Sequence, residues 1–246
     1  MSREVFFMTI EEAEHYTQEL RAEIVAAYMP HDRDARALGV PVLGSGRVFP
    51  VQEETIRVEP FLIPPHWPQI NGIDFGWDHP FAAVHCAWDR DADVFYVCKE
   101  YRMREATPLI HAAAVKPWGE WIPTAWPHDG LAHDKGSGEQ LALQYAVHGL
   151  AMLPERATFA DGHSGVEAGL LEMLERMQTA RWKVFSTCGG WFGEFRLYHR
   201  EDGIVVKRMD DLISASRYAL MMKRWAVVRP VRRAAHEPRG AGGWMA

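Results

Sequence analysis

The sequence predicts a mixed α/β fold in which one sheet is covered by helices. Three apolar segments between residues 70 and 101 are joined by loops of only a few residues, which permit antiparallel pairing but are too short for parallel crossovers. Strand-like and helical segments alternate after this meander, so a later strand can return beside the first in parallel. Functional residues are then expected at the carboxyl ends of the strands.

The first 65 residues predict a linker segment with one helix and short strands. Thr9 followed by Glu12 forms a capping box, and apolar residues at helical spacing continue to about Tyr28. Pro30 ends this helix. Glycine, proline and β-branched residues fill the following stretch, and a second proline-rich segment ends near residue 65, where we place the domain boundary.

The main domain is expected over residues 66–229, and residues 230–246 read as a flexible basic tail. The predicted strands cover residues 70–75, 81–88 and 94–101, a segment ending near Trp126, and the region around Val184 and Phe185. The predicted helices cover residues 108–115, 138–148, 166–177 and 211–225. Residues 190–207 contain Asp202-Gly203, which fits either a hairpin turn or a helix end.

Composition narrows the functional classes. With 246 residues, 48% of them hydrophobic, the chain can bury a substantial core. Its net charge of −6 gives no general attraction for nucleic acid, so such contact would need a local basic surface. Cys86, Cys98 and Cys188 form no CxxC pair, which argues against a disulfide framework or zinc ribbon and for a reducing cytoplasm. No apolar segment is long enough for a membrane span, and we expect no membrane partner.

Acidic residues stand at three sites that an α/β fold could bring together. Asp74 lies in GIDFGWD, Asp129 in WPHDG, and Asp210 and Asp211 in MDDLISASRY. We expect Asp74 in a buried strand, Asp129 after another strand, and the pair in the first turn of a helix. Like charges brought together repel unless a cation lies between them, so the pattern favours a divalent metal site.

Each acidic site also has a structural interpretation. Asp129 precedes Gly130 and could belong to an ordinary turn, and one of the helix-terminal aspartates could be an N-cap. We favour Asp211 as a ligand and Asp210 as its support, because Asp211 shares a helical face with small and apolar residues. Gly76 after Asp74 leaves room for a phosphate or a backbone segment to approach.

Oxygen ligands without clustered cysteine or histidine favour Mg²⁺ or Mn²⁺. A basic surface beside them would bind DNA phosphates. The candidates for that surface are Arg196, Arg200, Lys207 and Arg208.

These residues carry a family resemblance. The segments GIDFGWDHPFAAV, WPHDG with DKGSGE after it, and DDLISASRYAL resemble the nuclease domain of the large terminase subunit of tailed bacteriophages, a ribonuclease H-like fold. The likeness covers roughly residues 66–226. Upstream, HDRDARALG and LGSGRVFPV are similar to the segment that joins that family's ATPase domain to its nuclease.

The resemblance implies an endonuclease that cuts concatemeric double-stranded DNA at the start and end of viral genome packaging, with two Mg²⁺ or Mn²⁺ ions. Asp74, Asp129 and Asp211, with Asp210, would be the catalytic and metal-binding residues. The implied partners are DNA, an ATPase domain of the same full-length protein, the small terminase subunit and the portal, in the host cell cytoplasm. The family often has an acidic residue where this sequence has Ser214, which leaves the metal stoichiometry open.

Other functions stay open. A Holliday junction resolvase or a ribonuclease H would share the fold and chemistry, and a non-catalytic module could dock on DNA or the portal. A protein kinase is excluded, because the DFG at residues 74–76 has no HRD loop to accompany it. The GVPVLGSG segment lacks the GK[ST] ending of a phosphate loop, so no ATPase motor is expected in this chain.

Overall fold

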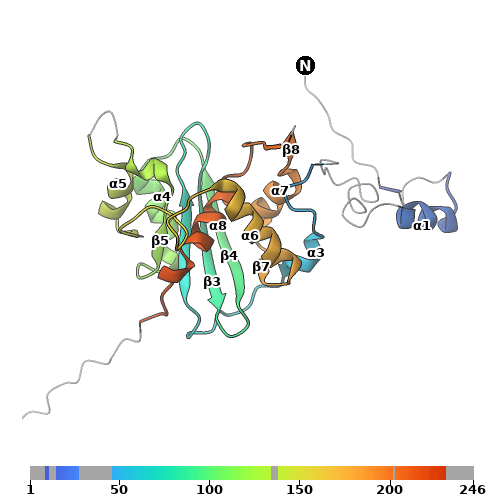
Figure 1. Ribbon diagram of the computed structural model, residues 1–246, viewed down its shortest axis with the longest axis horizontal. Helices are drawn as coiled ribbons and strands as arrows, with labels where there is room; N and C mark the ends of the chain where they lie inside the picture. Colours follow the sequence, from blue (N-terminus) through green and yellow to red (C-terminus); the bar gives the residue numbers. More distant parts are fainter. Residues whose placement is uncertain (1–8, 11–14, 28–45, 134–137, 202, 231–246) are drawn as a thin grey trace, which may run out of the picture.

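A seven-stranded mixed sheet forms the centre of the molecule, with helices packed around it (Figure 1). Its strands lie in the order β1-β7-β4-β3-β2-β5-β6. The computed structural model describes residues 9–10, 15–27, 46–133, 138–201 and 203–230. The strands are β1 Arg57–Val58, β2 Gln69–Asp74, β3 Phe81–Asp89, β4 Val94–Met103, β5 Pro123–Ala125, β6 Ala151–Met152, β7 Trp182–Phe185, β8 Arg200–Glu201 and β9 Ile204–Val205. The helices are α1 Gln18–Ala27, α3 Glu53–Ile56, α4 Pro108–Val115, α5 Leu141–Val147, α6 Val166–Gln178, α7 Gly189–Leu197 and α8 Asp211–Met221.

The antiparallel meander is confirmed. β2 pairs with β3, and β3 pairs with β4, both antiparallel. The remaining strands of the sheet are parallel to their neighbours: β5 joins β2, β6 joins β5, β7 joins β4 and β1 joins β7. The mixed α/β fold therefore agrees with the prediction, including the return of a later strand beside the first.

Helices cover both faces of this sheet. α8 packs on β2, β3 and β4, and α6 and α7 pack against α8. Phe81 points to the opposite face, where its ring stacks on His111 of α4 at 4.1 Å and on Tyr145 of α5 at 5.3 Å between centroids. Because side chains alternate along a strand, Ala82 and its partner Asp74 face α8.

Several predicted element boundaries need correction. The helix predicted over 138–148 begins at Leu141, after Gln140 in extended conformation. The first helix begins at Gln18, where the Leu20 N–H donates to Thr17 Oγ1 at 3.3 Å. The predicted capping box ends at Glu12, outside the described residues. The last helix ends at Met221, and a short 3-10 turn, Lys223–Trp225, follows it.

Residues 190–207, whose sequence fits either a hairpin turn or a helix end, contain both a helix and a hairpin. α7 ends at Leu197, and β8 then pairs antiparallel with β9. Gly203, in the connection between them, has a φ of +81°, a left-handed conformation that glycine adopts without steric cost. The hairpin interpretation of this sequence is therefore correct.

Residues from the stretch predicted as a linker take part in the sheet and its core. β1 extends the sheet beside β7. Phe49 and Ile56 are fully buried, and the Phe49 ring packs near Phe195 and Tyr198, at 6.1 and 5.9 Å between centroids. The hydrophobic core thus begins well before residue 65.

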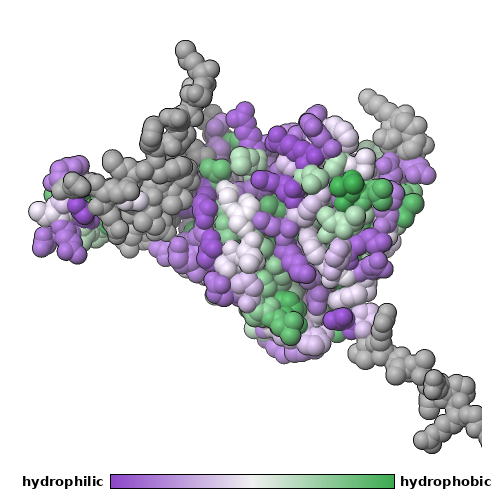
Figure 2. Space-filling view, turned by 180° about the vertical axis from the view of Figure 1, so that it is seen from behind, coloured by the Kyte–Doolittle hydropathy of each residue, from purple (hydrophilic) through white to green (hydrophobic). Residues whose placement is uncertain are grey.

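Most of the visible surface is polar, but hydrophobic side chains gather over α4 and α5 (Figure 2). Leu109, Ile110, Leu143 and Val147 are all exposed there. All three cysteines are buried and free. Among the described residues, no helix combines the length and apolar character that crossing a membrane requires.

Candidate metal centre

Two of the predicted acidic residues follow neighbouring parallel strands. β2 ends at Asp74, and Asp129 lies in the 3-10 turn His128–Leu131 just after β5. The register pairs Gly72 with Ala125, so both strands run toward the same edge of the sheet. Asp129 is exposed and Asp74 is half-buried. The carboxyl ends of two parallel strands therefore present both carboxylates at one edge.

Gly72 brings the helix-terminal aspartates to this edge. A Cβ atom on Gly72 would lie 2.0 Å from the carbonyl oxygen of Ala215, so only glycine permits α8 to approach β2 this closely. Asp74 lies two residues beyond Gly72 on the same face, and Asp211 lies one helical turn before Ala215. The two aspartates thus extend from this contact toward the same end of the layer.

Gly76 and Gly130, which follow two of the proposed ligands, both allow close packing of neighbouring atoms. A Cβ on Gly76 would meet the carbonyl oxygens of His79 and Pro80 at 2.3 and 2.6 Å, so the space at Gly76 is filled by backbone of its own loop. A Cβ on Gly130 would lie 2.4 Å from the Trp126 ring. The Asp129-Gly130 pair is therefore seated on a buried aromatic side chain.

The N-terminus of α8 is capped by Glu194 of α7 and not by a residue at the start of α8 itself. Its Oε2 accepts hydrogen bonds from the backbone N–H groups of Leu212 at 2.7 Å and Ile213 at 3.1 Å. Asp210, at the N-cap position, forms no side-chain capping bond to this fully described helix. The N-capping role that the sequence offers to Asp210 or Asp211 thus belongs to a residue from another helix, and the carboxylate of Asp210 is not used for it.

The same Glu194 holds Arg102 at the end of β4. The Arg102 Nη1 donates to Glu194 Oε1 at 2.6 Å, and the Glu194 side chain is fully buried. The pKa of Glu194 is raised to about 7, chiefly by burial and also by the Asp211 carboxylate, against the lowering effects of the bond from Ile213 and the charge of Arg102. Glu194 connects β4, α7 and the first turn of α8.

The charges at this edge interact strongly. Burial, followed by the charge of Asp211, raises the pKa of Asp74 to about 8, and Asp210 and Asp129 act in the same direction. The buried guanidinium of Arg217 opposes them. We call Asp74, Asp129, Asp210 and Asp211 the acidic cluster.

The pKa values of Asp210 and Asp211 are raised, first of all by burial. Asp211 is 9% exposed, and the charges of Arg102, His79 and Arg104 lower its pKa. The charges of Lys207 and Arg217 lower the pKa of Asp210. With a pKa of about 8, Asp74 keeps its proton to a higher pH than an ordinary aspartate does.

The donor chemistry of the acidic cluster fits a hard divalent cation, since carboxylate oxygens are the ligands that Mg²⁺ and Mn²⁺ prefer. Within the described ranges, however, no three His, Cys, Asp or Glu side chains stand close enough to enclose an ion as they are.

The four predicted DNA-binding residues fall into two groups. Arg196 pairs with Glu53, with distances of 2.7 Å from Nε and 2.8 Å from Nη2, and Arg200 pairs with Glu167 at 2.9 Å from Nη1. Arg200 therefore has a carboxylate partner of its own, whereas Arg196 shares Glu53 with Arg57. Lys207 and Arg208 are exposed between β9 and α8.

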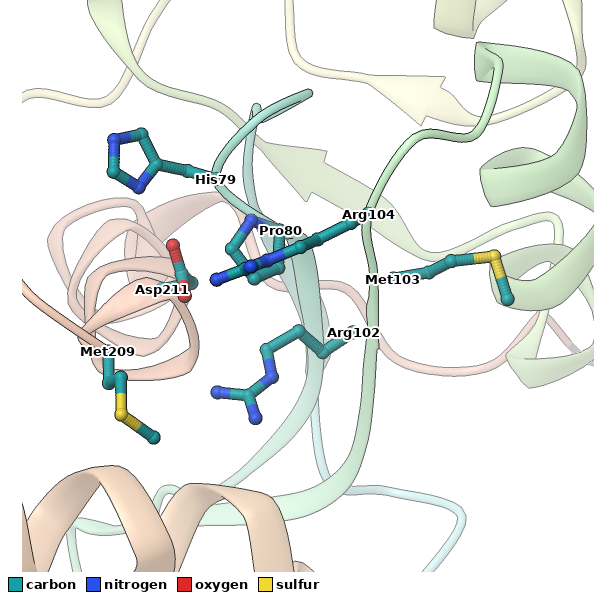
Figure 3. Close-up of a pocket in the computed structure, with 7 residues that line it drawn as sticks. All are labelled: His79, Pro80, Arg102, Met103, Arg104, Met209 and Asp211. Carbon is teal, nitrogen blue, oxygen red and sulfur yellow. The ribbon is translucent and has the colours of Figure 1, made fainter. Parts of the chain in front are cut away.

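A pocket of about 310 Å³ adjoins Asp211, and sequence analysis did not identify it. Its lining residues are His79, Pro80, Arg102, Met103, Arg104, Met209 and Asp211. Figure 3 shows the Arg104 side chain reaching toward Asp211, with the His79 ring beyond it and the Arg102 guanidinium below. The available signal was the spacing of Arg102 and Arg104, which share one side of the chain at the end of a predicted strand.

Comparison with known proteins matches the chain to terminase large subunits. The family model of the terminase RNaseH-like domain matches residues 71–223, and the model described as terminase large subunit, T4likevirus-type, N-terminal, matches residues 2–56. The chain is 50% identical over 234 residues to the terminase large subunit of Salmonella phage P22, covering 94% of this chain and 47% of that protein. It is 51% identical over 223 residues to that of Enterobacteria phage LP7, covering 90% and 47%. The chain thus spans about half the length of these relatives.

Solved structures agree with this result. The P22 large terminase nuclease domain matches with a TM-score of 0.71 and 50% identity, covering 75% of this chain and 96% of that one. The nuclease domain of the bacteriophage SPP1 large terminase g2p, solved with bound Mn, matches with a TM-score of 0.50 and 16% identity, covering 68% and 94%. At this low identity the SPP1 likeness shows the fold alone.

Proposed function

Because the chain belongs to the terminase family that shares an RNaseH-like domain, we propose that it is the DNA-cutting part of a large terminase subunit. The substrate is double-stranded DNA, and the reaction is hydrolysis of a phosphodiester bond. The 50% identity to the P22 nuclease domain supports this activity.

The observation that carries the proposal is that three separate elements, the end of β2, the turn after its parallel neighbour β5 and the start of α8, bring four aspartates to one end of the sheet. Asp129, Asp210 and Asp211 each raise the pKa of Asp74. Such a concentration of negative charge costs stability in the absence of a cation. Holding it together is useful to a protein whose reaction needs a metal there, and a purely structural role would not require it.

Asp74, Asp129 and Asp211 would hold two Mg²⁺ or Mn²⁺ ions, with Asp210 in support. When bound, the ions supply water activation and charge stabilisation for an in-line displacement at phosphorus. The SPP1 domain with bound Mn supports the choice of ion. Ser214 stands where the family often has a further acidic residue, so this chain offers one carboxylate fewer.

The chain's own residues keep the ligands in position. Asp74 pairs with Ala82 of β3, and Gly72, two residues earlier in β2, pairs with Ala125 of β5. Glu194 fixes the first turn of α8 through its bonds to Leu212 and Ile213. Rigid elements with supporting hydrogen bonds hold a site more precisely than loops do. Asp129, which follows a strand and is exposed, is the ligand with most freedom to adjust.

The cellular role follows from the family. We propose that the enzyme cuts concatemeric DNA when packaging begins and when it ends, in the host cell cytoplasm. An ATPase domain of the same full-length protein, the small terminase subunit and the portal would be its partners. The match of residues 2–56 to a large-subunit N-terminal model and the half-length coverage of the relatives support the ATPase domain.

Plasmid cleavage with Mg²⁺ or Mn²⁺ tests the function. We expect the native chain to cut and Asp74→Asn, Asp129→Asn and Asp211→Asn to lose most of the activity. Asp91→Asn is a matched control, because Asp91 is an exposed aspartate in the β3–β4 turn, at the far end of the strands from Asp74. Cleavage that persists in all three cluster variants would end the assignment.

The substrate distinguishes the alternatives. A ribonuclease H would prefer a DNA:RNA hybrid, and a Holliday junction resolvase would prefer a four-way junction over linear duplex. A non-catalytic docking module would bind DNA or the portal without cutting under any metal condition.

A further inference from the structure

The pocket beside Asp211 contains cationic side chains that the acidic cluster does not explain. Arg102 and Arg104 come from the end of β4, and His79 comes from the loop between β2 and β3. The backbone N–H of Glu105 donates to the carbonyl oxygen of Trp77 at 3.3 Å. This bond ties the loop to the end of β4, so the groups from both segments are held around one space.

The charges decide which class of ligand fits. The pocket's lining includes two guanidinium groups and only one carboxylate, that of Asp211, and it includes neither Asp74 nor Asp129. A metal cation would be repelled by the arginines, whereas an anion would be attracted by them. Guanidinium groups also match the geometry of phosphate oxygens, which they bind in pairs.

The two arginine side chains differ in how firmly other residues of the protein hold them. Arg102 is held by its bond to buried Glu194, which compensates its charge and fixes its position while 32% of its side chain remains exposed. Arg104 is exposed, and among the described residues it forms no ion pair within 4.0 Å. Arg104 is thus the side chain whose charge is most available for a ligand.

We propose that this pocket binds a backbone phosphate of the DNA strand, adjacent to the phosphate that is cut, with Arg104 and Arg102 as donors. The proposal rests on the proposed nuclease function and names how that site holds its substrate. Arg104 supplies most of the charge neutralisation, and Arg102 supplies a fixed donor. Because the contact is to the backbone, it positions the duplex and carries no sequence information.

The test is DNA affinity as a function of salt. Fluorescence anisotropy with a labelled duplex, with Ca²⁺ in place of Mg²⁺, would compare the native chain with Arg104→Ala and Arg104→Lys, and a gel would confirm that the duplex stays intact. Arg90→Ala is the matched control, since Arg90 lies in the β3–β4 turn at the opposite end of β4. We expect Arg104→Ala to weaken binding about three- to ten-fold and to reduce the salt slope by about one, with Arg104→Lys near the native slope.

The outcomes separate this proposal from the nuclease function. If the native chain binds and cuts DNA but Arg104→Ala matches Arg90→Ala in affinity and salt slope, the pocket proposal is wrong and the nuclease function stands. If Arg104→Ala loses only the binding of inorganic phosphate and keeps native affinity for duplex, the pocket takes a free anion and the proposal is also wrong. If the native chain binds duplex through Arg104 but cuts no nucleic acid with any metal, the nuclease function fails and the pocket is a DNA-binding site only.

Discussion

Glu194 of α7 accepts the backbone N–H of Leu212 at 2.7 Å and so provides the N-terminal cap of α8 from a neighbouring helix. The same carboxylate accepts a 2.6 Å bond from Arg102. One buried side chain therefore fixes both the helix that begins with Asp211 and an arginine of the adjacent pocket.

Replacing Glu194 should destabilise the protein strongly. Glu194→Ala leaves two helix N–H groups and a partly buried guanidinium without their partner, and we expect a loss of about 3–5 kcal/mol in the free energy of unfolding. Glu194→Gln keeps one acceptor oxygen and should cost less. Urea denaturation measures both. Glu201→Ala, which removes an exposed carboxylate, should change stability by no more than about 0.5 kcal/mol, and an equal effect of the two alanine variants would contradict the capping role.

Asp74→Asn should stabilise the metal-free protein in a pH-dependent way. The folded pKa of Asp74 is about 8, above its ordinary value of 3.8, so the folded state holds a proton that the unfolded state releases. The contribution of Asp74 to stability is present below about pH 4 and is lost as the pH rises toward 8. Asparagine removes this loss. The gain from Asp74→Asn should grow between pH 4 and 8 to on the order of 2–4 kcal/mol, measured by denaturation with EDTA at several pH values. A gain that is constant with pH would be the contrary result.

Binding of a divalent metal should offset the loss of stability that the ionised aspartates cause. Mn²⁺ added to the metal-free chain binds the folded state only, so it should raise the melting temperature by an amount that increases with metal concentration, equivalent to about 2.7 kcal/mol at a hundred times the Kd. Asp74→Asn and Asp211→Asn should lose most of this response, whereas Asp91→Asn should keep it. Scanning fluorimetry over a Mn²⁺ series provides the measurement, and equal responses in all variants would place the metal elsewhere.

Gly72→Ala should break the contact between β2 and α8. The added Cβ would lie 2.0 Å from Ala215 O, and the helix must shift, at a cost of about 2 kcal/mol or more. Gly193→Ala is the matched control, because nothing lies within 4 Å of a Cβ there, and alanine within α7 should stabilise by about 0.5–1 kcal/mol. Gly72→Ala should also reduce nuclease activity more than stability alone explains, since the shift separates Asp74 from Asp211. If the Gly72→Ala variant kept native activity at a temperature where it is fully folded, that link would be refuted.

Much of the fold could be predicted because short-range patterns determine it. The few-residue loops after Asp74 and Asp89 permit only antiparallel neighbours, and the structure has them. The acidic residues Asp74 and Asp211 could be assigned to a strand end and a helix start for the same reason. Their proposed role as ligands stays a prediction.

Long-range pairing could not be predicted. Nothing near Arg196 or Arg200 in the sequence indicates that they will pair with Glu53, 143 residues from Arg196, and Glu167, 33 residues from Arg200. The capping of α8 by Glu194 could not be predicted either, since only the packing of α7 on α8 brings the Glu194 carboxylate to Leu212. Local spacing determines elements, whereas the partners of charged side chains depend on how those elements pack.

The burial of Phe49 has a practical consequence for anyone who shortens this protein. A fragment starting at residue 66 would lose the edge strand Arg57–Val58 and uncover the aromatic rings of Phe195 and Tyr198. An open strand edge beside bare aromatic surface invites self-association. Recombinant versions meant to stay monomeric should therefore start upstream of Gly46.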